Sequence, residues 1–219
     1  MSAWQVSAAS PENGIARCTQ LNHIGETDKV AKWLFRPKRN SVAQNIRKIA
    51  VYCLSKSSAI HDKEKWIIKY NDGNLRLSLR NKVRELSGAI PKFSALKKLK
   101  YPDDVCYADC SSFAAFVAEV AIGQRINSDD IRTDNFVNLM GDKAFAESFT
   151  QYNFPDFENK YPNWAEGEGL KPGDIVITRP TPEKVPPGVK YPAGHAYIVV
   201  DTVGTEQSFQ ELYRKVLDN

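Results

Sequence analysis

Residues 107–120 read YADCSSFAAFVAEV, and their apolar residues repeat with the period of an α-helix. Positions i, i+3, i+4 and i+7 of one helical face are apolar, and they are Phe113, Phe116, Val117 and Val120. The stretch therefore predicts an amphipathic helix over roughly residues 111–122 that packs one face into a core.

Cys110 comes directly before this helix, between Asp109 and Ser111, two residue types that commonly cap a helix start. A helix N-terminus carries a partial positive charge, which favours a thiolate over a thiol. Its backbone N–H groups can also stabilise the oxyanion that forms when a thiolate attacks a carbonyl. Cys110 is thus a candidate nucleophile, with Asp109 and Ser111 at the oxyanion position. The alternative is a small cysteine buried for packing.

The other three cysteines, Cys18, Cys53 and Cys106, are interpreted as packing residues. Three residues separate Cys106 from Cys110, but no second Cys/His pair with ligand spacing follows, so no structural zinc site is expected. A disulfide framework is unusual in a chain of 219 residues. We expect reduced thiols, no metal and no other cofactor.

A nucleophilic cysteine needs a base, normally a histidine, and the chain has three histidines. His23 lies in a segment without regular patterning, and His61 follows a turn-like SSAI segment. His195 follows Gly194 and opens an apolar strand, which would hold the imidazole rigidly. Gly194, which has no side chain, leaves room for a substrate or another backbone to approach. His195 is therefore the candidate base.

Three sequence blocks follow one another in the second half of the chain: DCSSF at residues 109–113, LKPGDIVI at residues 170–177 and GHAYIVV at residues 194–200. Together they resemble the NlpC/P60 and CHAP superfamily of papain-like cysteine hydrolases, in which the cysteine block comes first. The resemblance implies that Cys110 is the nucleophile and His195 the base. It also implies an α+β fold in which the nucleophile helix packs on a small antiparallel sheet, with the site in the cleft between them.

The resemblance leaves two positions open. Family members carry a tyrosine-containing stretch upstream of the cysteine, a place in the substrate cleft that Tyr101 or Tyr107 would fill. They also take a third catalytic residue from the strand after the histidine strand, which here points to Glu206 and, after it, Gln207. If that segment is helical, neither side chain reaches the histidine and the enzyme works with a Cys–His dyad.

The chain is expected to divide into a basic, mainly helical N-terminal region (1–95) and a hydrolase domain (96–219). The expected elements are an irregular segment over 1–27, helical runs over 28–56 with Ser41 as a cap, a turn at 71–73 (NDG) and a helix to about 87, helices over 111–122 and 134–149, an irregular covering loop over 150–169, and strands in the LKPGDIVI and GHAYIVV blocks. The tail after residue 205 is compatible with a strand, a helix or one followed by the other.

Charge is distributed unevenly along the chain. Residues 29–100 hold 19 Lys/Arg and 4 Asp/Glu, whereas residues 101–219 hold 10 and 19. A basic surface that balances an acidic one explains this pattern; attraction to an anionic partner such as cell wall, nucleic acid or a membrane surface is the alternative. No stable nucleic-acid partner is expected. No apolar run approaches the ~20 residues that span a bilayer, and the N-terminus lacks the features of a Sec signal peptide.

The reaction that the resemblance implies is amide hydrolysis, and superfamily members most often cut peptidoglycan peptides. The chain also looks similar to compact type VI secretion amidase effectors. We therefore expect a monomeric antibacterial toxin, made in the cytoplasm and delivered to a target-cell periplasm, with a cognate immunity protein and a secretion-system carrier. Two alternatives stay open: a papain-like hydrolase, transferase or deamidase that acts on a protein target, and a non-catalytic binding module of the same fold.

Overall fold

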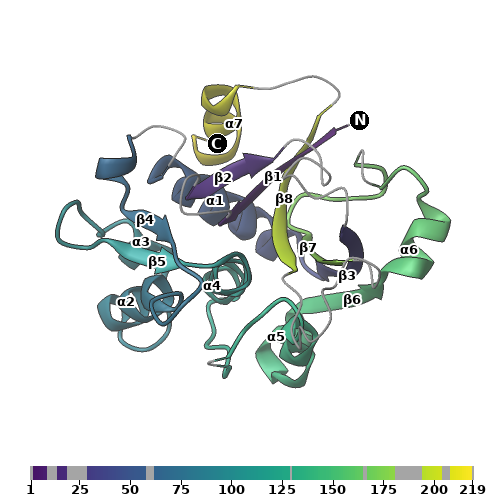
Figure 1. Ribbon diagram of the computed structural model, residues 1–219, viewed down its shortest axis with the longest axis horizontal. Helices are drawn as coiled ribbons and strands as arrows, with labels where there is room; N and C mark the ends of the chain where they lie inside the picture. Colours follow the sequence, from purple (N-terminus) through teal and green to yellow (C-terminus); the bar gives the residue numbers. More distant parts are fainter. Residues whose placement is uncertain are drawn as a thin grey trace.

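The computed structural model describes residues 2–8, 14–18, 29–57, 62–128, 130–164, 167–180, 194–203 and 208–218. It has an α+β fold around a six-stranded antiparallel sheet with the strand order β2-β1-β8-β7-β3-β6 (Figure 1). In that order the strands are Ile15–Cys18, Ser2–Ala8, His195–Val203, Ile175–Pro180, Lys29–Pro37 and Phe149–Asn153. The predicted α+β class with an antiparallel sheet is thus confirmed.

The N-terminal segment forms strands β1 and β2, where the sequence analysis expected irregular structure. In β1, Trp4, Val6 and Ala8 face one core while Gln5 and Ser7 alternate with them, a period-two pattern too short to stand out. Strand β1 pairs with β8, and β3 pairs with β7. Strand β3, from before residue 95, therefore lies between β7 and β6, from after it, so the expected boundary at residue 95 runs through a single sheet. The described part of residues 1–95 contains strands β1, β2 and β3 as well as helices.

Strand β3 occupies residues that were expected to form the first helical run. Trp33 and Phe35 pack into the larger core cluster, whereas Leu34 packs into a smaller cluster on the other face of the sheet. A strand that is buried on both faces reads as a continuous apolar run, which periodicity alone cannot distinguish from a buried helix. These residues form a strand because they pair with β6 on one side and with β7 on the other.

Two faces of the sheet can be distinguished by their side chains. The α4 face carries, among others, Ala196 and Ile198, which belong to the cluster that includes helices α1 (Asn40–Ser55) and α4 (Cys110–Ile122). Helix α4 packs against α1 and against strands β8 and β1. The α6 face carries Tyr197 and Val199, which cluster with residues of α6 (Phe154–Lys160). Figure 1 shows α6 at the right edge of the molecule, away from α4.

Helix α4 is held at both ends by its own sequence. The Asp109 side chain accepts the N–H of Ser112, and the Ser112 side chain accepts the N–H of Asp109, which makes a capping box. Gly123, with φ 65°, ends the helix. Every residue of α4 is buried, so the helix is enclosed on all sides rather than on the single face that its periodicity predicted. Its alanines are small enough for neighbouring helices to approach.

A second, two-stranded parallel sheet pairs β4 (Ile68–Tyr70) with β5 (Cys106–Ala108). The predicted turn after β4 is confirmed, because Asn71 Oδ1 accepts the N–H groups of Gly73 and Leu75. Helix α2 (Ser78–Ser87) follows, as expected. This unit lies on the left of Figure 1.

The remaining elements differ from expectation in part. Helix α1 has Arg39 as its N-cap, and its described residues provide no side-chain cap, so Ser41 does not cap it. Residues 149–160 form β6 and α6 instead of an irregular loop. The tail resolves into a helix, α7 (Phe209–Leu217). The other elements are η1 (Lys63–Lys65), α3 (Phe93–Leu96), η2 (Phe136–Gly141) and α5 (Lys143–Ser148). None of the helices in the described ranges is both long enough and apolar enough to cross a membrane.

Candidate functional site

Cys110 is the first residue of α4, where the sequence placed it. Its side chain lies in the larger core cluster, and the residue is 8% exposed. Because Asp109 is the N-cap, the sulfur stands at the end of the helix where backbone N–H groups point outward. This position is suited to a nucleophile with limited access from solvent.

Asp109 and Ser111, the residues expected near the oxyanion, fix the turn around Cys110. Asp109 Oδ1 accepts from Ser112 N at 2.6 Å and from Ser111 Oγ at 2.9 Å. Asp109 Oδ2 lies 3.3 Å from Arg76 Nη1, which also donates to the carbonyl of Ile131. The Ser112 amide is thus already used by Asp109 and is not a donor for an oxyanion.

Tyr70 is a neighbour of Cys110 that the sequence analysis missed. It ends β4 and pairs with Ala108 of β5, two residues before Cys110. Its pKa is raised, first by burial and then by the negative charge of a Cys110 thiolate and of Asp72 and Asp109. Its phenol therefore stays protonated at neutral pH and keeps a hydrogen to donate. No local pattern marks Tyr70, because the β4–β5 pairing alone brings it here.

His195 is the first residue of β8 and is 5% exposed. Its Nε2 lies 3.1 Å from Ser7 Oγ of strand β1. Its ring packs edge-on against Tyr197, with the ring centroids 4.5 Å apart. Tyr197 belongs to the cluster on the α6 face, so these contacts place the His195 ring on that face.

The contacts of His195 and the cluster that holds Cys110 therefore lie on opposite faces of the sheet. Side chains alternate along β8, so Ala196 and Ile198 face α4 while His195 and Tyr197 face the other way. Sequence spacing does not predict the face on which the His195 side chain lies, because that face depends on the register of β8 in the sheet.

The strand beside β8 is also not the expected one. The family pattern takes the third residue from a strand that follows the histidine strand, but β8 lies between β7 and the N-terminal strand β1. Ser7 of β1 occupies the position next to the imidazole. Glu206 and Gln207, the predicted third residues, lie outside the described residues, as do His23 and His61.

Gly194 has the tight surroundings that the sequence predicted. A Cβ at this residue would lie 2.4 Å from the carbonyl oxygen of Thr178 and 2.7 Å from Thr133 Oγ1. Only glycine allows these groups to approach so closely.

Of the two candidate cleft tyrosines, Tyr101 is 46% exposed, and Tyr107 lies in β5, where its backbone N–H donates to Ser78 Oγ.

A buried polar strip runs beside His195 on the α6 face. Thr178 is the cross-strand partner of His195, and Gln5 and Ser7 lie on β1. Within the part of the chain that the structure describes, neither polar atom of the Gln5 amide makes a hydrogen bond, and Thr178 Oγ1 makes none. Unpaired buried polar groups are costly, so such a strip calls for an explanation.

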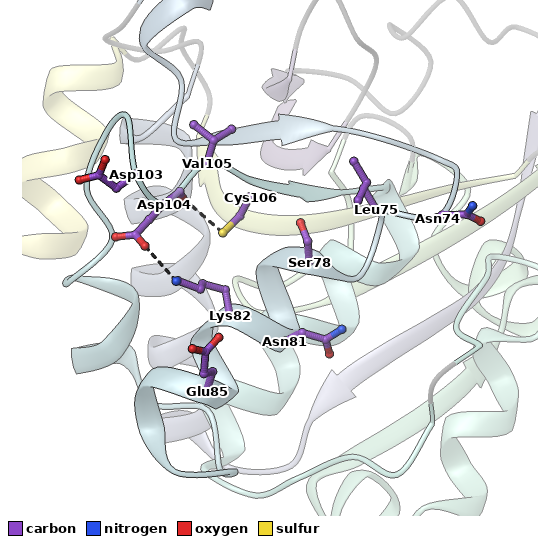
Figure 2. Close-up of a pocket in the computed structure, with 10 residues that line it drawn as sticks. All are labelled: Asn74, Leu75, Ser78, Asn81, Lys82, Glu85, Asp103, Asp104, Val105 and Cys106. Atoms are coloured by element: carbon purple, nitrogen blue, oxygen red, sulfur yellow. Dashed lines mark hydrogen bonds and ion pairs between the residues drawn. The ribbon is translucent and has the colours of Figure 1, made fainter.

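Cys53 and Cys106 behave as packing residues. Burial raises the pKa of Cys53, and burial followed by the charge of Asp104 raises that of Cys106 to about 12. Cys106 lines a cavity of about 430 Å³ beside α2, where its thiol donates to the Asp104 carbonyl and Lys82 pairs with the Asp104 carboxylate (Figure 2). Three carboxylates (Glu85, Asp103 and Asp104) and one ammonium (Lys82) line this cavity, and Lys82 pairs with Asp104. The side chain of Cys18 lies outside the described parts.

Across the ranges that are described, no group of three or more His, Cys, Asp or Glu side chains is arranged to hold a metal ion. Comparison of the chain with protein-family models, with curated proteins and with solved structures gave no match. The functional reading therefore depends on the site itself.

Proposed function

We propose that this protein is a cysteine amidase or endopeptidase that acts through Cys110 on peptidoglycan peptides. The observation that carries the proposal is the position of Cys110 as the first residue of α4, directly after the N-cap Asp109. A helix N-terminus stabilises a thiolate and the oxyanion that follows it. The resemblance of the DCSSF, LKPGDIVI and GHAYIVV blocks to the NlpC/P60 superfamily supports the same reading.

In the proposed reaction the Cys110 thiolate attacks the amide carbonyl, and a carbon–sulfur bond forms as the carbonyl oxygen becomes an oxyanion. First-turn N–H groups and the Tyr70 phenol hold that oxyanion; Ser112 N does not contribute, since it is bound to Asp109. The C–N bond then breaks, and the leaving amine takes a proton from the His195 imidazolium. Water, deprotonated by His195, hydrolyses the thioester and restores the thiol.

His195 is the proposed base because it is the first residue of β8, directly after Gly194, where Thr178 and Thr133 pack closely against the backbone. Its Nε2 lies 3.1 Å from Ser7 Oγ, and the proposed mechanism assigns proton transfer to Nδ1. Ser7 therefore takes the orienting role in the proposed site, in a papain-like arrangement completed by an N-terminal strand.

The proposed biological setting is that of an antibacterial effector. Peptidoglycan peptides are the substrate, and a cognate inhibitor and a delivery system are the expected partners. These assignments follow from the resemblance and from the amide chemistry, and the basic segment 29–100 suits contact with an anionic wall.

A non-catalytic binding module is the second candidate. It is favoured by the placement of the His195 contacts on the face opposite to the Cys110 cluster. In that case Cys110 is a buried packing residue and Ser7–His195 is a structural hydrogen bond. A papain-like enzyme that acts on a protein target would use the same site as the wall amidase, and the two candidates differ only in their substrate.

The decisive experiment is mass spectrometry of purified sacculi after incubation with wild type, Cys110→Ala, His195→Gln and the matched control Cys106→Ala. We expect new stem-peptide fragments from wild type and Cys106→Ala only. Fragments from His195→Gln would assign the base elsewhere, and fragments from Cys110→Ala would refute the proposal. If no variant releases fragments although a thiol probe labels Cys110, the substrate is a protein rather than the wall.

A further inference from the structure

A second cavity, separate from the residues around Cys110, lies where the first turn of α1 meets the end of β3 and the turn before β7. Its volume is about 580 Å³. Four cationic side chains line it from three parts of the chain: Arg36, Lys38, Arg47 and Lys171. Asp174 is the only carboxylate among its described lining residues.

Asp174 is hydrogen-bonded to the side chain of one of these cations, Arg36, and the charge of Lys171 also acts on it. It accepts two hydrogen bonds from Arg36, from Nε at 2.8 Å and from Nη2 at 2.6 Å, and a third from the backbone N–H of Lys171 at 2.7 Å. Burial lowers the pKa of Arg36, but the hydrogen bond and charge of Asp174 outweigh it, and the net pKa is raised. Arg36 and Asp174 thus form a closed pair in one wall.

Within the described residues, Asp174 forms a salt bridge with Arg36 and with none of the other three cations. Lys38 Nζ donates to a neutral acceptor, the carbonyl of Ala146. Arg47 Nε donates to the carbonyl of Val200, and its Nη2 lies 3.9 Å from an Asp201 oxygen that Lys215 Nζ approaches at 2.5 Å. Lys171 contributes a further side-chain charge at the rim. Cations that converge on a cavity without matching carboxylates favour an anionic ligand.

The LKPGD block builds this cavity. Gly173 has φ 97°, and a Cβ there would lie 2.7 Å from Ala43 Cα in the first turn of α1. The turn therefore rests directly on α1, and the same turn brings Lys171 to the cavity that Lys38 and Arg47 also line. A conformation with positive φ and contact with another backbone requires glycine.

We propose that this cavity binds a phosphate-type oxyanion through Lys38, Arg47 and Lys171. This set suits phosphate, because the two lysine ammonium groups act as point charges and the Arg47 guanidinium adds a third positive charge. Free phosphate or phosphate monoesters and the phosphodiesters of an anionic polymer share this chemistry. The inference does not depend on the Cys110 reaction.

The test is a titration of the full chain at constant ionic strength. Binding is measured by amide chemical shifts in nuclear magnetic resonance and by calorimetry. One arm uses inorganic phosphate, and the other uses glycerophosphoglycerol, a phosphodiester. The pocket variant is Lys38→Gln/Lys171→Gln, and the matched control, Lys63→Gln/Lys65→Gln, removes the same charge from the exposed η1 segment. All four lysines are exposed, so both variants are expected to fold.

We expect shifts at residues 36–47 and 171–174, and an affinity at least tenfold lower in the pocket variant than in the control. Tighter phosphate than phosphodiester binding would assign free phosphate or a monoester as the ligand class; the reverse would assign a phosphodiester polymer. Equal loss in both variants would mean general charge attraction and overturn the proposal. So would shifts centred elsewhere, or no binding of either probe at 20 mM.

Discussion

Ser7 Oγ lies 3.1 Å from His195 Nε2, and the two residues are 188 positions apart in the sequence. Both are buried. The contact exists because β1 inserts between β2 and β8 and so places the N-terminal segment beside the histidine strand. A residue from the start of the chain thus lies beside the proposed catalytic histidine.

Replacing Ser7 by alanine tests whether this hydrogen bond orients a working base. A buried hydrogen bond contributes about 1 kcal/mol, so we expect kcat to fall roughly fivefold with little change in KM. The pH profile should shift as well, and Ser7→Thr should restore part of the rate. If Ser7→Ala lowers the free energy of unfolding by a similar amount while kcat and the pH profile stay unchanged, the bond is purely structural.

Thiol reactivity should separate Cys110 from the packing cysteines. The pKa of Cys106 is raised to about 12, and that of Cys53 is also raised, so neither forms thiolate at neutral pH. Cys110, at a helix N-terminus, should react with iodoacetamide at least tenfold faster at pH 7.5. Peptide mapping of partly alkylated protein measures the three rates in one sample. Comparable rates at Cys110 and Cys106 would contradict an activated nucleophile.

Gln5 should be replaceable with a gain in stability. Its amide is fully buried and, among the described residues, has no hydrogen-bond partner. Gln5→Met keeps the volume and removes the unpaired groups, so we expect the free energy of unfolding to rise by about 1–3 kcal/mol. Urea unfolding followed by circular dichroism gives the value. A loss of stability would show that the amide is satisfied in solution, and lost activity alongside a gain would assign the amide to substrate binding.

Replacing Glu119 should lower the stability of the protein, in contrast to replacing Gln5. Glu119 is fully buried in α4 and binds two arginines of α2: Arg80 Nε donates to Oε2, and Arg84 Nε donates to Oε1 at 2.8 Å. Glu119→Gln leaves buried positive charge uncompensated, and we expect a loss of about 3–5 kcal/mol in the free energy of unfolding. The exposed Glu85→Gln in α2 is the control and should change stability by less than about 0.5 kcal/mol. Similar values for both variants would refute a buried ionic network.

The fragment 96–219 should not fold alone, although the sequence analysis treated it as a domain. It lacks β1 and β3, which pair with β8, β7 and β6. Without them β7 and β8 form an isolated pair with open edges, which is marginally stable at best. Circular dichroism and amide chemical-shift dispersion of the fragment, compared with the full chain, measure this. A cooperatively unfolding fragment with dispersed shifts would restore the boundary near residue 95.

Much of the local structure around the candidate site was predictable from sequence. Helix α4 begins at Cys110 with Asp109 as its cap, the NDG turn precedes α2, and strands β7 and β8 lie in the predicted blocks. Each of these depends on residues a few positions apart. Residues 29–37 form strand β3 where a helix was expected, because an apolar run that is buried on both faces has no distinguishing periodicity.

Local sequence is sufficient to place the start of α4, and with it Cys110 at a helix N-terminus, because capping and periodicity act within one or two turns. The residues around that start and around His195 come from distant parts of the chain and depend on the folded sheet. The β4–β5 pairing brings Tyr70 to Cys110, and the register of β1 against β8 brings Ser7 to His195. The folded sheet also decided which face His195 takes, because a shift of one residue in strand register exchanges every side chain between the two faces of a sheet.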